Sequence, residues 1–246
     1  MEKFSDFYTK SRATSIGFFP GGFKPPHAGH FAAVQAMLGY SVRNPETGNS
    51  ILLPGSKTSD FVHIIIGHSP RGSEQQNTSW KRLKKNDPPE SRESLQSTMI
   101  TKEMSRDIWE LYISQGDPGL RDKVNVSISS HASPVIGMEQ EILNLDNDEI
   151  KSNNIHLYAG SEDQARYSYF ISDRFKQKIS DNKGVDINNI NVVNNMIDRL
   201  GSATDARSSI LRVAVDQYDT QTLEKFIPAG VNVIDFMKLL KNFRDV

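Results

Sequence analysis

The stretch from Ser15 to Tyr40, SIGFFPGGFKPPHAGHFAAVQAMLGY, constrains the fold of this chain more than any other. It begins with an apolar run, Ser15–Phe19, that predicts a short strand. The segment Pro20–Pro26 is rich in proline and glycine, and we expect it to continue neither a strand nor a helix. Apolar residues then recur at helical spacing as far as Leu38. The sequence therefore predicts a strand, a loop and a helix in immediate succession.

A pair of histidines, His27 and His30, stands with Gly29 where this helix is expected to begin. The first turn of a helix has unpaired backbone N–H groups and the positive end of the helix dipole, so it favours an anion. Two imidazoles and the ammonium group of Lys24 strengthen that preference, and together they indicate a polyphosphate-binding site. A metal pair at i, i+3 and two histidines satisfied within the core are the alternatives. No third metal ligand lies nearby in the sequence, which disfavours the first of these.

Composition narrows the class of protein. The chain of 246 residues is expected to form a single domain over 1–246. Cysteine is absent, which excludes disulfides and cysteine nucleophiles and fits a reducing compartment. No apolar run approaches the roughly 20 residues needed to cross a bilayer, and the start has no signal-peptide core. With a net charge of −1 and a pI near 6.6, we expect a soluble cytoplasmic protein that binds neither nucleic acid nor membrane. Its oligomeric state stays open.

Further apolar runs along the chain predict strands, and helical patterns stand between them. The clearest strand is 61–67, FVHIIIG, which is continuous and β-branched like the doubly buried strands of parallel sheets. Helices are expected after Thr101, from Ser133 to about Leu145, and around Tyr167 to Phe175. This alternation predicts an α/β, Rossmann-like, doubly wound and mostly parallel sheet with helices on both faces. The other strands are predicted at 123–129, 155–159 and 190–193, with polar connections at 41–60, 146–154 and 180–189 and a short lead-in at 1–14.

A long polar segment, 68–92, interrupts this alternation. It holds six Lys or Arg residues against three Asp or Glu residues and shows little periodicity. Loops of this length inside a compact domain are usually functional or disordered. A lid over substrate phosphates and a solvated insertion are both compatible with the pattern. Arg71 is the best single candidate for a ligand contact, because it comes soon after the end of a predicted strand.

Several polar residues follow the ends of predicted strands. In an open parallel sheet the carboxyl ends of the strands meet at one edge, and ligands bind there near the topological switch point. We therefore expect these residues to share one site with His27 and His30. For one of them, Asp163, a ligand contact and the capping of the next helix are equally compatible. The residues concerned are Arg71, His131, Gly160 and Asp163.

A second signature, Gly201–Arg207 (GSATDAR), precedes another apolar-periodic stretch. Ser202 with Asp205 three residues on has the form of a capping box, and such helix starts are common. Its N–H groups and hydroxyls suit an anion as well, and Arg207 adds a forked cation that matches phosphate. By itself this segment is a weak signal of a binding site.

The two signatures together resemble those of the cytidylyltransferase-like nucleotidyltransferases, the HxGH superfamily. The first family motif, G-x-F-x-P-x-H-x-G-H, is met with one residue of slack between Phe23 and His27. The second, I-S-S-T-x-x-R, is met at Ser202, Thr204 and Arg207, whereas Ala203 replaces its middle serine. Segments such as YAGSEDQARYSYF are similar to nucleotidyltransferases encoded by large tailed bacteriophages, which implies action in the host cytoplasm.

This resemblance implies transfer of a nucleoside monophosphate from a triphosphate to a phosphorylated small molecule, with release of pyrophosphate. His27 and His30 would contact the α- and β-phosphates, and Lys24 and Arg207 would neutralise the β- and γ-phosphates. Mg²⁺ would be held by the triphosphate and water, without a protein cage. Substrate contacts are expected from Arg71, His131 and Arg166. The expected nucleotide-binding residues are Phe19, Gly21, Gly22, Phe23, Gly29, Gly160, Asp163, Ser202 and Thr204.

The identity of the nucleotide and of the acceptor is less constrained. The arginine that ends SATDAR is typical of the adenylyltransferase branch, and we find no R-T-x-G-I-S-T-T motif of the cytidylyltransferases. ATP is therefore favoured over CTP, with nicotinamide mononucleotide as the first acceptor to consider. A nucleotide-binding module without catalysis is the alternative from another class. A nucleic-acid binder built on Lys81–Lys85 is disfavoured by the neutral charge balance and the lack of interleaved aromatic residues.

Overall fold

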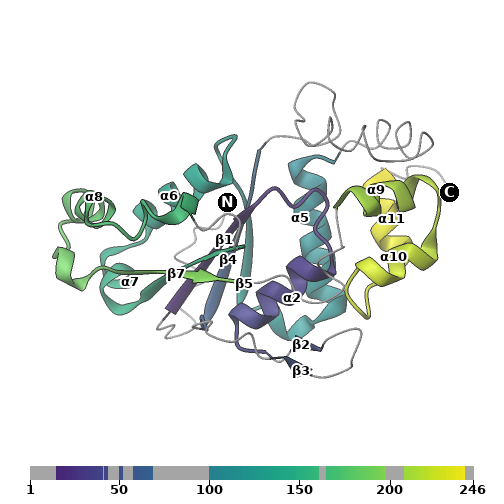
Figure 1. Cartoon of the computed structure of the whole chain (residues 1–246), viewed down its shortest axis with the longest axis horizontal. Coiled ribbons are helices and arrows are strands. Elements are labelled where there is room, and N and C mark those ends of the chain that lie inside the picture. Colours follow the sequence, from purple (N-terminus) through teal and green to yellow (C-terminus); the bar gives the residue numbers. More distant parts are fainter. Residues whose placement is uncertain are drawn as a thin grey trace.

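The computed structural model describes residues 15–40, 42–43, 50–51, 58–68, 100–160, 165–197 and 208–241. Within them, five strands form one parallel sheet in the order β5-β4-β1-β6-β7 (Figure 1). Counted along the chain this is the order 3-2-1-4-5 of a doubly wound, Rossmann-like fold, which confirms the α/β prediction. The strands are β1 (Ser15–Gly21), β4 (Phe61–Ile66), β5 (Val124–Ile128), β6 (Asn154–Ala159) and β7 (Asn191–Met196), and a separate antiparallel pair is formed by β2 (Val42–Arg43) and β3 (Ser50–Ile51).

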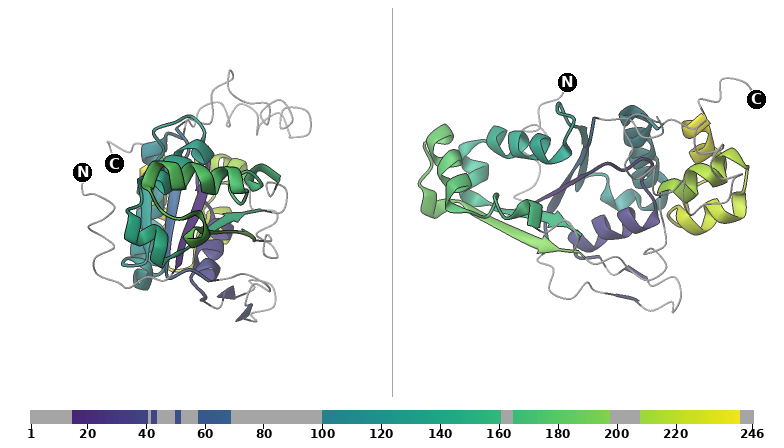
Figure 2. Two further views of the ribbon diagram at one scale, coloured as in Figure 1. Left: turned by 90° about the vertical axis from the view of Figure 1, so that its left-hand side faces the viewer. Right: turned by 45° about the horizontal axis from the view of Figure 1, so that its top comes forward.

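Helices cover both faces of the sheet (Figures 1 and 2). One face carries α2 (Ala28–Met37), α5 (Lys102–Leu111) and the C-terminal helices α9 (Ser208–Asp216), α10 (Thr220–Phe226) and α11 (Val233–Lys241). The other face carries α6 (Pro134–Asn144), α7 (Asn147–Ser152) and α8 (Asp173–Lys183). The short turns are the π-helical Tyr112–Gly116 and the 3-10 helices Pro118–Leu120 and Ile187–Asn189.

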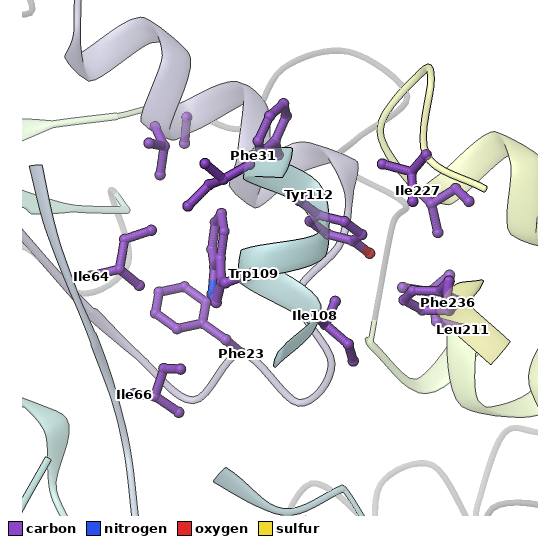
Figure 3. Close-up of a cluster of buried hydrophobic side chains, with 14 of the residues drawn as sticks. Phe23, Phe31, Ile64, Ile66, Ile108, Trp109, Tyr112, Leu211, Ile227 and Phe236 are labelled. Atoms are coloured by element: carbon purple, nitrogen blue, oxygen red, sulfur yellow. The ribbon is translucent and has the colours of Figure 1, made fainter. Parts of the chain in front are cut away.

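Two cores result, one on each face of the sheet. Val62, Ile64 and Ile66 of β4 point into the first core and Ile65 into the second, and all four are fully buried. This alternation explains why β4 is the clearest strand in the sequence, since both of its faces must be apolar. Figure 3 shows the first core, where aromatic rings from α5 and the following turn lie between the sheet and the C-terminal helices.

The central strand β1 is paired unequally on its two sides. Its ladder with β4 runs to Gly21, opposite Ile66, whereas its ladder with β6 ends at Phe18, opposite Leu157. The chain passes from β1 to β4 on one side and reaches β6 on the other side only after β5, so the topological switch point lies between β1 and β6. The two strands stop pairing there three residues before β1 ends. Open α/β sheets bind ligands at this place.

The predicted boundary of the first strand was wrong, because β1 continues through Pro20 and Gly21. The carbonyl of Gly21 accepts a hydrogen bond from the N–H of Gly67, so the backbone groups of Gly21 face β4. Those of Pro20 face the opposite side, where the β6 ladder has already ended. A proline that lacks an N–H can remain in a strand where no partner needs that donor.

Other boundaries also differ from the predictions. The connection predicted at 146–154 contains α7, which begins with a capping box between Asp146 and Glu149. Tyr167 and Phe170 are buried, but they lie in turns before α8, whose first residue is Asp173. That helix extends to Lys183 and takes up the start of the loop predicted at 180–189. Apolar spacing alone did not separate a helix from buried turn residues.

Some predictions concern residues outside the described ranges. They include the lead-in 1–14, the segment 68–92 apart from His68, and the second signature Gly201–Arg207. Among the described helices, none combines the length and the apolar character that crossing a membrane requires.

The buried His63 makes a first prediction about stability. Its Nε2 lies 2.8 Å from the Ser127 hydroxyl, and burial lowers its pKa from 6.5 to about 3. The unfolded chain binds a proton here below about pH 6.5, whereas the folded chain does not until about pH 3. The free energy of unfolding should therefore fall as the pH decreases through this window, by about 1 kcal/mol per pH unit from this group.

The measurement is chemical denaturation of the wild type and His63→Gln between pH 4 and 7. Because Gln does not titrate, the variant should show a pH slope that is shallower by about 1 kcal/mol per pH unit. The other titrating groups are common to both proteins, so the difference between the slopes isolates His63. Equal slopes would contradict the prediction.

Candidate phosphate-binding site

The site begins where β1 ends. Residues 22–27 leave the sheet as a loop, and His27 is the N-cap residue of α2 with an extended backbone (φ −135°, ψ 172°). His27 is nearly buried and His30, one turn into the helix, is half-buried. The predicted strand, loop and helix therefore carry both histidines to the carboxyl edge of the sheet, next to the switch point.

The two histidines together form the cap of α2. The N–H of Gly29 donates to Nδ1 of His27 over 3.2 Å, and the N–H of His27 donates to Nδ1 of His30 over 3.3 Å. This arrangement is a capping box in which imidazoles take the places usually filled by Ser or Thr and Glu. The two rings lie face to face, with centroids 3.7 Å apart and planes inclined by 30°.

These hydrogen bonds assign the tautomers of both rings. A ring nitrogen that accepts a hydrogen bond carries no proton, so in the neutral imidazole the proton is on Nε2. Each histidine thus receives a backbone N–H on Nδ1 and presents an N–H donor at Nε2. Accepting a hydrogen bond at Nδ1 polarises each ring, which strengthens the N–H donor at its Nε2. The sequence predicts that the N–H of Gly29 binds an anion directly. In the structure this N–H donates to the ring of His27 instead.

Side chains from other elements hold the loop that leads to His27. Each of its four consecutive carbonyls, from Phe23 to Pro26, accepts a hydrogen bond from a side chain. Pro25 and Pro26 have no N–H, so this loop cannot order itself through its own backbone donors at those positions. The bonds run from Ser105 Oγ to Phe23 O, from Arg212 Nη1 to Lys24 O (2.5 Å), from Ser208 Oγ to Pro25 O (2.7 Å) and from Tyr112 Oη to Pro26 O (3.0 Å).

Phe23 anchors the loop in the first core. Its φ of 43° lies in the left-handed region, which a side chain other than Gly adopts only where the surroundings impose it. The ring packs edge-on against Trp109, with ring centroids 5.4 Å apart (Figure 3). It also packs edge-on against His30, with centroids 5.1 Å apart. A Cβ on Gly21 would lie 2.4 Å from this ring, so Gly21 makes room for Phe23. The buried ring of Phe23 therefore packs against His30 and restricts the position of its imidazole.

Four other residues of the predicted site lie on β1, in the loop and at the start of α2, and they differ in burial and contacts. Phe19 packs against Phe23 in the core, at 5.0 Å between ring centroids, and Lys24 is only 3% exposed. Gly22 is half-buried in the loop, and Gly29 supplies the N–H that caps His27. Their contacts with a nucleotide stay predictions.

Two candidates lie at other strand ends of the same edge. Gly160 directly follows β6, and a Cβ there would meet open space, so packing does not demand glycine. His131 is exposed after β5, where its Nε2 lies 2.8 Å from Nε2 of Gln140. Since β5 is two strands from β1, about 10 Å separates these two strands in the sheet. Gly160 thus follows a strand that neighbours β1, whereas His131 follows a strand two places from β1.

Of the remaining candidates, only Arg166 lies within the described residues, and it is exposed in a 3-10 turn. The others, Arg71, Asp163, Ser202, Thr204 and Arg207, lie outside the described residues.

Sequence reasoning missed all four side chains that hold the loop as members of the site. Tyr112 stands at the end of the helix predicted after Thr101, and it is fully buried. Ser105 and Arg212 are also buried, at 0% and 5% exposure, and each has a fully buried apolar residue three positions further along its helix. A polar residue on an apolar stripe signals that it has a partner in the fold. The signal does not say which partner, because Ser105 and Arg212 are 82 and 188 residues from theirs.

Replacing His27 tests its role as the cap. Asn is among the best N-cap residues and keeps a side-chain acceptor, so His27→Asn should leave the free energy of unfolding nearly unchanged. His27→Ala removes the acceptor and should lower that free energy by about 1 kcal/mol. Urea denaturation of the three proteins measures both effects. If the Asn and Ala variants were equally destabilised, the acceptor at Nδ1 would not be what stabilises the start of α2.

Models of protein families give no match to this chain, and neither do the curated proteins. The part of the chain that the structure describes contains no group of three or more His, Asp or Glu side chains arranged to hold a metal ion. The site is thus a pair of imidazoles at the start of α2, each accepting a backbone N–H on Nδ1, beside the switch point of a parallel Rossmann-like α/β sheet.

Proposed function

We propose that this chain is a nucleotidyltransferase that moves a nucleoside monophosphate from a triphosphate to a phosphorylated small molecule and releases pyrophosphate. AMP from ATP is the favoured group, with nicotinamide mononucleotide as the first acceptor to test. Transfer of CMP from CTP is the alternative within the same class.

The observation that carries this proposal is the paired capping of His27 and His30. Both rings are held by backbone N–H groups so that both Nε2–H donors are preorganised at one helix start. A cap alone requires a single small acceptor, and Ser, Thr, Asp or Asn would supply it. Each imidazole accepts a backbone N–H on Nδ1 and can donate from Nε2. Two such rings stacked side by side suit a ligand with several neighbouring anionic oxygens, such as a polyphosphate.

The chemistry needs little from the protein beyond positioning and charge stabilisation. A phosphate oxygen of the acceptor forms a bond to the α-phosphorus as the bond from that phosphorus to the bridging oxygen of the β-phosphate breaks. The pyrophosphate leaves with the electron pair of that bond. Because the attacking phosphate is already ionised, no side chain has to remove a proton. His27 and His30 would donate to the phosphoryl oxygens as charge develops on them.

As the resemblance implies, a Mg²⁺ ion in this reaction would take its ligands from phosphate and water. The C-terminal segment supports the same location for the polyphosphate. Helix α9, which follows the second signature in sequence, begins at Ser208, and the hydroxyl of Ser208 donates to the carbonyl of Pro25. Ser208 directly follows the second signature in sequence, and its hydrogen bond to Pro25 lies in the loop of the first signature.

A non-catalytic nucleotide-binding module is the alternative from another class. Binding alone would make use of the helix start and the positive charge, but it would not depend on both Nε2–H donors. The two classes differ in one observable. Only the transferase releases pyrophosphate, and only when triphosphate and acceptor are both present.

The test is a pyrophosphate-release assay with the four nucleoside triphosphates against a panel of phosphorylated acceptors that includes nicotinamide mononucleotide. His27→Asn keeps the cap but lacks a donor at the Nε2 position, whereas His27→Gln places an amide N–H near it. We expect the Asn variant to lose about 10²–10³ in kcat with little change in KM, and the Gln variant to lose less. The corresponding changes at His30 should follow the same order.

Three outcomes are informative. Substrate-dependent release that falls in the Asn variants supports the transferase and the role of the ring donors. Full activity in the Asn variants at both positions would refute that role. Tight triphosphate binding by the wild type without release for any acceptor would favour the binding module.

A further inference from the structure

A lysine and a histidine meet at the carboxyl edge of the sheet, on the β4 side of the central strand β1. The Nζ of Lys102 lies 2.7 Å from Nε2 of His68, whose ring is exposed. An ammonium group has only N–H donors, so this ring nitrogen accepts, and the neutral ring carries its proton on Nδ1. The pair Lys102–His68 thus combines an ammonium group with an imidazole N–H donor.

The backbone places His68 next to the end of β1. His68 directly follows Gly67, whose N–H donates to the carbonyl of Gly21 over 2.9 Å. Gly21 is the last residue of β1, and the loop that leads to the histidine pair begins after it. Since consecutive Cα atoms are about 3.8 Å apart, His68 stands one residue from a hydrogen bond to that strand end.

The helix places Lys102 on the side of α5 that faces the same loop. Ser105 and Trp109 follow Lys102 by three and seven positions, so the three residues share one face of the helix. Ser105 donates to the carbonyl of Phe23, and the ring of Trp109 packs against the ring of Phe23. Phe23 in turn packs against His30. Lys102 therefore lies one turn from a residue that bonds to the loop of the histidine pair.

Neither helix stability nor ion pairing accounts for a lysine at this position. Lys102 is the first residue of α5, where the positive end of the helix dipole opposes a cation. The carboxylate of Glu103 lies 3.7 Å from Nζ, with the two side chains 24% and 53% exposed, and such a surface pair contributes little. His68 uses one of the three N–H donors of the ammonium group. An anion bound here would receive a stronger, charge-assisted hydrogen bond.

The proposed reaction supplies such an anion. The acceptor phosphate has to approach the α-phosphorus of a triphosphate that is itself negatively charged, and like charges about 4 Å apart repel each other. A cation beside the acceptor phosphate reduces this repulsion and holds the attacking oxygen in place. Lys102 and His68 supply a cation and a second donor at the strand end next to β1.

We propose that Lys102 and His68 bind the phosphate group of the acceptor and thereby select a phosphate monoester as the attacking substrate. This inference rests on the proposed function, because it requires a triphosphate at the histidine pair. It also gives the direction of the acceptor, whose phosphate lies over the end of β4, on the opposite side of β1 from β6.

Binding of inorganic phosphate tests the proposal without presupposing one acceptor. Calorimetry would titrate phosphate into protein saturated with Mg²⁺ and α,β-methylene-ATP, an analogue that cannot transfer its nucleotide. Titration of the analogue itself gives the affinity of the triphosphate site. Lys102→Met removes the charge, Lys102→Arg keeps it, and His68→Ala removes the imidazole. Lys176→Met is the matched control, because Lys176 is a half-buried lysine, the fourth residue of α8, on the other face of the sheet.

Lys102→Met should bind phosphate about 10–100-fold more weakly than the wild type, the range expected for losing a hydrogen bond to a charged group. His68→Ala should lose about 3–10-fold, as expected for a neutral donor, and Lys102→Arg should lose less than Lys102→Met. Lys176→Met should bind phosphate as the wild type does. All four variants should bind the triphosphate analogue within about threefold of the wild type, which a general loss of structure would not allow.

The outcomes separate this inference from the proposed function. If the wild type binds the analogue but phosphate binds no more weakly to Lys102→Met and His68→Ala, the inference is wrong and the proposed function stands. Equal losses of affinity for phosphate and for the analogue would also overturn the inference, because the pair would then serve the triphosphate. If the wild type does not bind the analogue, the proposed function is wrong and the inference falls with it. Melting temperatures identify any variant that does not fold, and the exposed His68 position then decides.

Discussion

The site depends on one physical constraint, which is that the loop between β1 and α2 cannot order itself. Two of the four residues from Phe23 to Pro26 are prolines, which supply no N–H donor, and the buried carbonyls of the loop need donors from elsewhere in the fold. Those donors come from α5, from the turn after it and from α9, and every one of the four carbonyls is occupied. The loop is therefore fixed before any ligand arrives, which is what preorganised catalysis or recognition requires.

The need for outside donors also links this loop to the aromatic residues of the first core. Trp109 and Tyr112 lie between the loop and the C-terminal helices, and the ring of Tyr112 stacks on Phe236 of α11 with centroids 6.1 Å apart (Figure 3). Tyr112 thus uses its ring to hold α11 and its hydroxyl to hold Pro26. Burial raises the pKa of this hydroxyl well above its usual value, so it stays a donor. One side chain links hydrophobic packing to the geometry of the histidine pair.

Sequence periodicity was sufficient to predict the fold class. A parallel sheet buries its strands on both faces, so these strands appear as continuous apolar runs such as FVHIIIG. It also located the start of α2, since His27 and His30 follow a proline-rich loop. It could not find Ser105 or Arg212, whose partners lie far away in the sequence and are backbone atoms with no residue identity to recognise. It also misjudged α7, where a capping box in a polar segment outweighs the lack of apolar spacing.

The contacts of α9 imply that the site and the C-terminal helices are ordered together. Leu211, Ala214 and Val215 of α9 are buried in the first core, and Arg212 and Ser208 on the same helix hold the loop. Any opening that separates α9 from the sheet must break both hydrogen bonds and expose those apolar side chains in one step. The core then resists such an opening far more than two hydrogen bonds alone would, because burial of each large apolar side chain contributes roughly 1.5–3 kcal/mol. Local unfolding of the C-terminal helices would thus free the carbonyls of Lys24 and Pro25, and the loop before the histidine pair would keep only the donors from Ser105 and Tyr112.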